Sequence, residues 1–316
     1  MKTNLWICIC LTTILLVLAG CGDSNNASDT TDAGNKTQNQ DDTHLTQDTE
    51  TESTKNIDKE ITTESETEED TDTERPKPTT AYFLVDSAGL GGTGVGCDLN
   101  NDGQVDNNLA RMVNDFLTLG ILKGDPSDEI KDSIRSGVVL IVFKISEVQS
   151  FENDSQIVLE EYDATIEGFD LQKDPPPANL FSGYGTVSLD ETASSQFDNS
   201  RIEDWWVQTP DSPMIVPLSI AGEVVNVELA TGRVQANIEV APGDEMLGGN
   251  LGSGLICGGI EKKYLIDLLI EKAKIKDSVS QGIARAAVST RVDFKCGDDD
   301  CVSVGVVFTA VSIGIE

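Results

Sequence analysis

Alternating hydrophobic and polar positions dominate the chain after residue 80. A period of two is typical of half-buried strands, whereas apolar residues three and four apart indicate helices. Strands predominate and do not alternate regularly with helices. We therefore expect a mainly β domain over 81–316, an antiparallel β-sandwich with helical insertions. The segments that predict strands are 81–86, 138–148, 156–166, 185–189, 214–221, 223–229, 233–240 and 301–315, and those that predict helices are 107–119, 127–135 and 260–274.

Two of the predicted strands form a candidate hairpin. Val224–Leu229 and Val234–Val240 each alternate apolar and polar residues, and Thr231-Gly232 lies between them. Glycine in such a short connection is a common signal for a turn between antiparallel strands. The pattern therefore predicts that the chain reverses at residues 231–232.

The N-terminus carries a different hydrophobic pattern, a single apolar run from Leu5 to Val17 after a basic start. The run is too short for a membrane span and is typical of an export signal. The residues that follow, Leu18-Ala19-Gly20-Cys21, resemble the lipobox of bacterial lipoproteins. That resemblance implies cleavage after residue 20, acylation of Cys21 and, because Gly22 rather than Asp follows, sorting to the outer membrane. An ordinary secretory signal that happens to contain a cysteine is the alternative.

Residues 21–80 are rich in Asp, Glu, Thr, Ser, Asn and Gln and have few apolar side chains. Such a segment cannot bury enough surface to offset the entropy of ordering, so we expect a disordered, self-repelling tether. The whole chain carries a formal net charge of −33, which argues against nucleic-acid binding because phosphates would be repelled. The single histidine, His44, lies in this tether, so the predicted domain has no imidazole for a Ser-His-Asp triad or a zinc site.

The segment Asp98-Leu99-Asn100-Asn101-Asp102-Gly103-Gln104-Val105-Asp106 is the most informative motif. Oxygen-bearing side chains at alternate positions can converge in a tight loop, and calcium prefers such a cage of oxygens. The segment resembles the first half of an EF-hand loop, but Leu109 stands at the twelfth position, where that family has a bidentate Glu. With its final aspartate it instead resembles dockerin-like, thrombospondin-type and integrin-type calcium loops. We expect a calcium site over 98–109 with ligands Asp98, Asn100, Asp102, Gln104 and Asp106; the alternative is a solvent-exposed turn.

Residues 95–122 and 209–316 resemble an uncharacterised group of exported proteins of Gram-negative bacteria. The matching features are the 96–107 loop followed by a helix, the Pro217-Leu218 strand with its hairpin, a glycine-rich turn at 247–259 and the closing 302–311 strand. The resemblance implies export, and it implies no activity.

Four cysteines remain once Cys8, Cys10 and Cys21 are assigned to the signal region: Cys97, Cys257, Cys296 and Cys301. An even number in an exported protein favours disulfides, and three pairings are open. Cys296 and Cys301 would close a small loop naturally, which leaves Cys97 for Cys257. A zinc site made of all four thiolates is the alternative, although the paired spacing typical of such sites is missing.

The adjacent tryptophans Trp205 and Trp206 are the remaining candidates for ligand contact. In a strand their rings would point to opposite faces, so we expect one in the core and the other partly exposed. The exposed ring could stack on a sugar or contact a partner, or both rings could serve packing alone. Acidic pairs such as Glu160-Glu161 and Glu203-Asp204 could serve a glycosidase, but sequence alone does not place carboxylates across a cleft.

These features together predict an envelope-anchored, calcium-stabilised surface lipoprotein with a binding or adhesion role, and they favour a binding protein over an enzyme. Its expected partners are a glycan or a surface protein, and its only expected membrane attachment is the lipid anchor. The alternative function is a carboxylate-dependent glycan hydrolase on a jelly-roll scaffold.

Overall fold

The computed structural model describes residues 79–118, 124–168, 175–220, 223–239, 249–272 and 275–316. The predicted signal peptide, Cys21 and nearly all of the predicted tether lie outside the described residues. Within them, the chain folds mainly into antiparallel strands, as the alternating pattern predicted.

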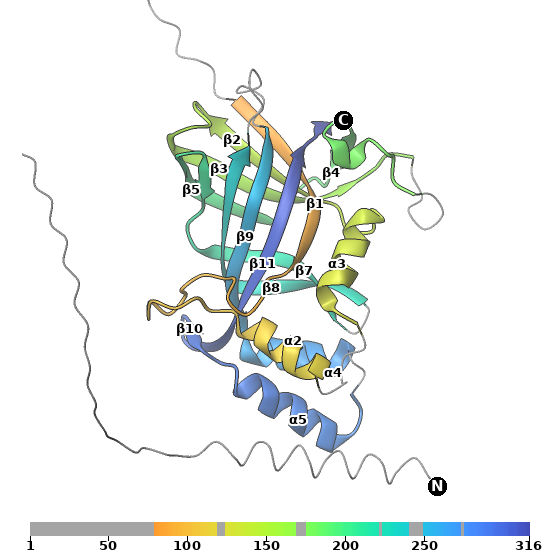
Figure 1. The fold of residues 1–316 in the computed structure, drawn as a ribbon, viewed down its shortest axis with the longest axis vertical. Coiled ribbons are helices and arrows are strands. Elements are labelled where there is room, and N and C mark those ends of the chain that lie inside the picture. Colours follow the sequence, from red (N-terminus) through yellow and green to blue (C-terminus); the bar gives the residue numbers. More distant parts are fainter. Residues whose placement is uncertain (1–78, 119–123, 169–174, 221–222, 240–248, 273–274) are drawn as a thin grey trace, which may run out of the picture. The chain divides into compact units, whose positions relative to one another are not determined.

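Eight of the described strands close into a ring (Figure 1). In spatial order they are β3 (Asp154–Thr165), β2 (Ile141–Val148), β1 (Thr79–Leu90), β11 (Asp299–Ser312), β9 (Asn250–Glu261), β8 (Glu223–Glu239), β6 (Trp206–Gln208) and β5 (Ser195–Glu203). The ring closes because β5 pairs with β3. The expected sandwich of two packed sheets is therefore replaced by one closed barrel. Both architectures need strands with one apolar face, so the pattern of side chains could not separate them.

Alternate residues of these strands fill the barrel. Phe83, Phe143, Phe197 and Ile157 are fully buried members of one large hydrophobic cluster. The rings of Phe143 and Phe308 lie 5.2 Å apart, centroid to centroid. Burying these side chains is the main stabilising contribution to the barrel, at about 1.5–3 kcal/mol for each large residue.

The segment 223–239 is one long strand, β8, and not the predicted hairpin. Strand β7 (Ser212–Ile220) pairs with its first half, while β6 and β9 pair with its second half. A Cβ atom on Gly232 would lie 2.6 Å from the side chain of Met214. The glycine therefore permits close packing between strands and does not form a turn.

The predicted glycine-rich turn at 247–259 is also wrong over its described part, because Asn250–Glu261 forms strand β9. A Cβ atom on Gly254 would lie 2.6 Å from the ring of Phe308, and one on Gly258 would lie 2.3 Å from the carbonyl oxygen of Thr231. These glycines make room for neighbours on the barrel wall.

Helices α2 (Asn108–Thr118), α4 (Lys262–Lys272) and α5 (Ser278–Ser289) lie together at one end of the barrel, and α3 (Pro126–Arg135) lies beside its wall (Figure 1). Their buried apolar residues, including Met112, Ile130, Leu265 and Val288, join the barrel cluster. Asp125 and Asp277 accept hydrogen bonds from backbone N–H groups in the first turns of α3 and α5, which explains where these helices begin.

Short elements complete the fold. Strand β10 (Phe294–Cys296) pairs with β11, and β4 (Thr186–Leu189) pairs with β3 and with β12 (Gly314–Ile315). The short helix η1 (Leu180–Ser182) contributes Leu180 to a second, smaller apolar cluster with Leu84, Val142 and Ile313. This cluster covers residues of β1 and β2 that point away from the barrel interior.

Candidate functional site

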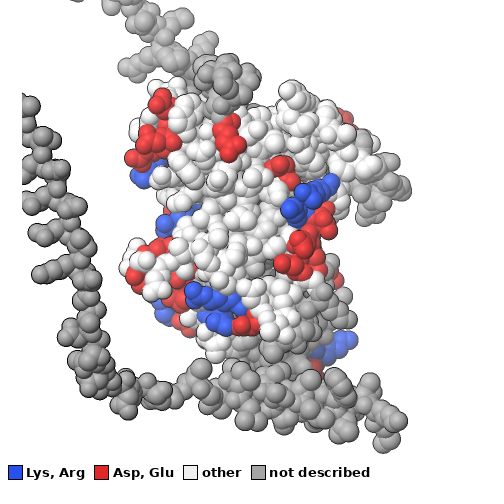
Figure 2. Space-filling view, in the orientation of Figure 1, with Lys and Arg blue, Asp and Glu red and all other residues white. Residues whose placement is uncertain are grey.

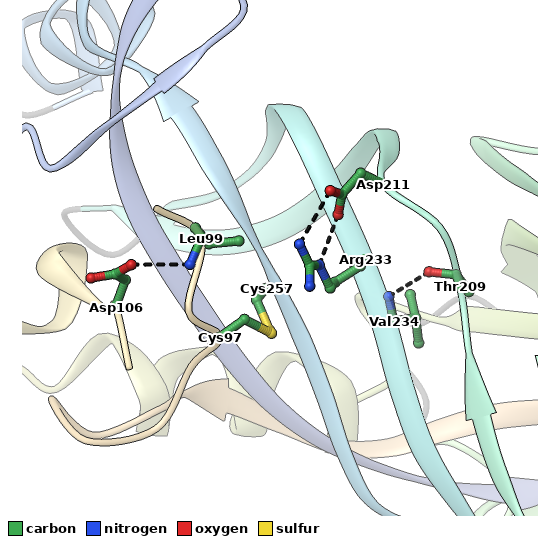
Figure 3. A network of polar contacts seen from close by, with 8 residues as sticks. All are labelled: Cys97, Leu99, Asp106, Thr209, Asp211, Arg233, Val234 and Cys257. Atoms are coloured by element: carbon green, nitrogen blue, oxygen red, sulfur yellow. Dashed lines mark hydrogen bonds and ion pairs between the residues drawn. A yellow bond between two sulfur atoms is a disulfide. The ribbon is translucent and has the colours of Figure 1, made fainter. Parts of the chain in front are cut away.

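The predicted calcium loop lies against the outside of the barrel, where a disulfide holds it (Figure 3). Cys97 is bonded to Cys257 on β9, and the Asp106 N–H donates to the Cys97 carbonyl over 2.9 Å. A Cβ atom on Gly305 of β11 would lie 2.5 Å from the carbonyl oxygen of Val95. Glycine at this position therefore allows the loop backbone to approach the sheet.

Asn107 is the central polar residue of this attachment and is fully buried. Its side-chain Nδ2 lies within hydrogen-bond distance of four carbonyl oxygens, those of Gly91, Gly92, Val95 and Gly305, at 2.8–3.3 Å. Its Oδ1 accepts from the N–H of residue 110 in the first turn of α2, so the same side chain caps the helix. One amide thus joins the loop, β11 and α2.

The side-chain oxygens of the predicted ligands accept hydrogen bonds from loop amides. Asp98 accepts from the N–H groups of residues 102 and 103, and Asn100 also accepts from that of residue 102. Asp102 accepts from the Gln104 N–H at 2.8 Å. Gly103 has a φ of 83°, the left-handed conformation that the turn requires. These bonds fix a tight loop whose oxygens retain further lone pairs.

Asp106 lies apart from the exposed ligands, because its side chain is 8% exposed and accepts from the Leu99 N–H at 3.0 Å. Burial raises the pKa of Asp293 above its ordinary value; hydrogen bonds from Ser303 lower it, and the nearby Asp106 carboxylate raises it further. Among the described residues, no three His, Cys, Asp or Glu side chains come close enough together to hold a metal ion. The calcium site therefore stays a prediction.

Both predicted disulfides are present. Cys97 is bonded to Cys257 across 160 residues, and Cys296 to Cys301 across five. The second bond joins β10 to β11, where Asp300 forms ion pairs with Lys295 and Lys262.

The two tryptophans lie at the turn between β5 and β6. Asp204 and Trp205 form a two-residue connection in which both have positive φ, 50° and 66°. This conformation is costly for a large side chain. It is held because Trp205 donates from its N–H to Glu152 and accepts at its carbonyl from Ile238. Trp205 is half-buried and packs against the barrel cluster, whereas Trp206 is 39% exposed. The expected difference in exposure is found, but its cause is not strand alternation, because Trp205 lies in the turn and only Trp206 lies in a strand.

Trp206 points outward from the barrel, opposite Asn237 of β8. The next outward row crosses five strands: Arg201, Gln208, Gln235, Leu255 and Val307 are register partners in turn. Neighbouring strands lie about 4.8 Å apart, so this row spans roughly 19 Å. We call Trp206, Gln208, Gln235, Asn237 and Leu255 the tryptophan face.

The amides of the tryptophan face have unused hydrogen-bonding capacity. Gln235 and Asn237 are half-buried, and neither side-chain amide has a hydrogen-bond partner within the described part of the chain. Gln208 accepts from Arg201 at 2.8 Å. Each free amide can donate and accept at once, which matches the hydroxyl groups of a polar ligand.

The tryptophan face is bordered by fixed charge pairs and continues into an uncharged area. Arg233 of β8 binds Asp211 through two hydrogen bonds of 2.7 and 3.1 Å, and Thr209 accepts from the Val234 N–H (Figure 3). These contacts fix the chain between β6 and β7 onto β8. Charged side chains form separate groups around a broad uncharged area (Figure 2). Residues 250–260 of β9 and 301–312 of β11 include no charged residue.

The acidic pairs considered for hydrolysis lie outside the two hollows described below. Glu160 forms an ion pair with Lys144 at 2.6 Å, while the adjacent Glu161 points the other way and is buried. An apolar cavity of about 60 Å³ lies among α2, α3, α4 and the β7–β8 pair, and a shallow hollow of about 490 Å³ lies beside Tyr264. Neither acidic pair lines either of these two spaces.

Sequence reasoning missed Asn107, Gln235 and Asn237. The helix-capping role of Asn107 had a signal, because Asn is a preferred residue just before a helix. No sequence pattern pointed to the two amides on β8, because they become candidates for binding only when β6 places Trp206 beside them.

No helix in the described part of the chain is long and apolar enough to cross a membrane. Comparisons of the chain with protein-family models, curated proteins and solved structures returned no match.

Proposed function

We propose that this chain is an envelope-anchored, calcium-stabilised lipoprotein whose barrel binds neutral glycans on the tryptophan face. The observation that carries the proposal is the exposed ring of Trp206 beside the half-buried amide of Asn237, which has no hydrogen-bond partner among the described residues. An indole ring offers a flat apolar surface for the C–H face of a sugar. The neighbouring amides offer donors and acceptors to its hydroxyl groups.

Charge favours a neutral ligand over an anionic one. The chain's formal net charge of −33 repels polyanions, including nucleic acids. Arg201 beside the face is engaged with Gln208 and forms a 3.6 Å ion pair with Glu203, so it is not free for a carboxylate or sulfate. A neutral polysaccharide matches a ring and free amides better than a protein partner, which would need a larger apolar centre.

The β5–β6 turn holds the backbone before Trp206 in place, so the ring can meet a ligand without a rearrangement of the chain. Trp205 packs against the barrel cluster at the β5–β6 connection, and its backbone is hydrogen-bonded to both β8 and the loop before β3. Trp206 follows it directly and therefore starts from a fixed backbone. A ligand that stacks on a pre-organised ring loses less affinity to ordering than one that must immobilise a flexible side chain.

Calcium is the proposed stabiliser of the loop that lies on β9 and β11. The donor set of Asp98, Asn100, Asp102, Gln104 and Asp106 provides hard oxygen ligands, which is the chemistry calcium prefers. Three aspartates in one short loop repel each other, and a divalent cation would remove that repulsion. Without a bidentate Glu at residue 109, affinity should be that of extracellular modules, on the order of 10⁻⁴–10⁻³ M.

The anchor rests on the lipobox resemblance. Acylation at Cys21 would hold the protein at the membrane, and the acidic segment 22–78 would let the barrel stand away from it. Cys21→Ser should release the protein into the soluble fraction of cells. Membrane retention of this variant in high salt would contradict the anchor, and it would leave the glycan proposal to be judged separately.

An array of immobilised neutral polysaccharides tests binding and distinguishes it from hydrolysis. Retention of the purified protein without release of shorter sugars supports the proposal. Release of sugars that stops on substituting one carboxylate would support the glycan hydrolase instead. Retention on no neutral polysaccharide in the array would contradict the glycan-binding proposal.

A further inference from the structure

Glu161 is a buried carboxyl group in the wall of the barrel. On β3, residues 157, 159 and 161 point inward, and the first two belong to the hydrophobic cluster. Glu161 is only 4% exposed and has Phe143 of β2 and Ser195 of β5 as its register partners. An acidic side chain in this position needs a specific explanation, because buried carboxylates are normally paired.

The hydrogen bonds around Glu161 satisfy only part of the carboxyl group. The Ser195 hydroxyl bonds to it, and the Ser195 Oγ also accepts from the Ile215 N–H of β7 at 3.1 Å. The other oxygen, Glu161 Oε2, is buried and has no partner within the described residues. An ionised carboxylate with an unbonded oxygen in an apolar wall is strongly unfavourable, so the folded barrel holds this group as the neutral acid.

Few charges act on the group from the surrounding elements. Its register partners, Phe143 of β2 and Ser195 of β5, are not titratable, and β7 contributes the Ile215 N–H, which donates to the same Ser195 hydroxyl. Asp163, two residues further along β3, is negative and disfavours ionisation. Lys144 lies on the opposite side of the wall and is paired with Glu160. Burial, and after it the Asp163 charge, raises the pKa of Glu161 to about 8, with the Ser195 hydrogen bond acting in the opposite direction.

The location of Glu161 gives its protonation a structural consequence. The β3–β5 pairing closes the ring, and Glu161 opposite Ser195 is the last pair of this seam. The Ser194 N–H donates to the Glu161 carbonyl at 2.7 Å, directly beside it. Asp163, two residues further along the strand, is exposed. The carboxyl group is therefore close to solvent and reaches it when the end of the seam separates.

We propose that the β3–β5 seam is a proton-linked closure, which is held shut while Glu161 is neutral and opens when the group releases its proton to water. The seam continues through β5 into the Asp204–Trp205 connection that precedes Trp206, so opening would also disturb the tryptophan face. The proposal rests on the fold alone and does not require that the face bind a glycan.

The link between proton release and opening predicts how the opening equilibrium depends on pH. In the open form Glu161 is hydrated and ionises near its ordinary value of 4.5, whereas in the closed form it ionises near 8. Between these values each pH unit favours the open form by a further tenfold, because opening releases one proton. Below and above this window the opening equilibrium should not depend on pH through this group.

Amide hydrogen exchange of the full chain tests the closure. For the amides of residues 195–197, protection relative to an unfolded chain at the same pH should fall about tenfold per pH unit between pH 5 and 8. Glu161→Gln cannot ionise and should show protection independent of pH there. Glu160→Gln, its neighbour on the outer side, should keep the wild-type slope.

Wild-type protection that does not change with pH, or the same slope in Glu161→Gln, would overturn the proposal. Should Glu161→Gln fail to fold, the pH titration of the Glu161 carboxyl ¹³C chemical shift in the wild-type protein tests the proposal instead. Titration near pH 8 supports the closure, and titration near 4.5 overturns it. Neither readout depends on a ligand, so failure of the glycan proposal would leave this result unchanged.

Discussion

The Nδ2 atom of Asn107 lies 3.3 Å from the carbonyl oxygen of Gly305, a residue 198 positions further along the chain. The contact ties the start of α2 to the outside of β11. With the three other carbonyl contacts of the same amide, it fixes the whole loop from Gly91 onto the barrel. The predicted calcium ligands therefore lie on a backbone that is held at both ends, by Cys97 and by Asn107.

Asn107→Ala should be among the most destabilising single polar substitutions in the described part of the chain. It removes a helix cap and leaves buried carbonyl oxygens without a donor, at a combined cost of about 2–4 kcal/mol in the free energy of unfolding. Asn108→Ala is the matched control, because that side chain bonds only to Arg111 at the surface. Denaturant titration of both variants checks this, and equal stability of the two would contradict the role given to Asn107.

The two disulfides should contribute unequally to stability. On the loop-entropy model, closing 160 residues stabilises the fold by about 5 kcal/mol, whereas closing five contributes about 2 kcal/mol. Replacing Cys97 and Cys257 by Ser should therefore lower the melting temperature more than replacing Cys296 and Cys301. A larger loss from the short loop would show that local strain or packing, and not chain entropy, decides the difference.

The disulfides and the barrel strands show how much of the structure can be predicted from the sequence alone. The disulfide pairing followed from spacing, because a five-residue separation closes easily and leaves one other pair. The alternating pattern identified most of the barrel strands, including 301–315, which the structure has as β11 and β12. Ring closure could not be derived, since it depends on β5 returning to β3 and no local pattern records that pairing.

Glycines were the main source of error. Gly232, Gly254 and Gly258 lie within strands, where a side chain would collide with Met214, Phe308 or Thr231. In the sequence they are indistinguishable from turn glycines, because both roles require only the absence of a Cβ atom. The same limit applies to Asn237, whose value as a binding residue comes from the register of β6 on β8.

The global stability of the protein should fall with rising pH through Glu161. The pKa of this group is about 8 in the folded state, against an ordinary value of 4.5, so the folded state retains a proton that the unfolded state has lost. Stability is then lost at about 1.4 kcal/mol per pH unit between those values and levels off above pH 8.

The difference in unfolding free energy between wild type and Glu161→Gln isolates this effect from other titrating groups. Chemical denaturation at several pH values should give a difference that grows in favour of the glutamine variant up to about pH 8. A constant difference across the range would contradict the raised pKa.

Calcium should raise the melting temperature of the purified protein at millimolar concentration. At the proposed site the ion would bind the folded loop and not the unfolded chain, so stabilisation would follow from mass action. Asp102→Ala should abolish the effect, while Asp298→Ala, an exposed aspartate at the turn between β10 and β11, should leave it intact. A melting temperature that calcium does not change would show that the loop is only an Asx-rich turn.

The affinity of the purified protein for a neutral polysaccharide retained on the array tests the central claim most directly. Trp206→Ala should weaken binding at least about tenfold, a loss of ~1.4 kcal/mol, because the stacking surface is removed. Tyr184→Ala provides the matched control, since this ring is 84% exposed and lies outside the tryptophan face. The account predicts loss of affinity in the first variant and wild-type affinity in the second. Wild-type affinity in Trp206→Ala would contradict it.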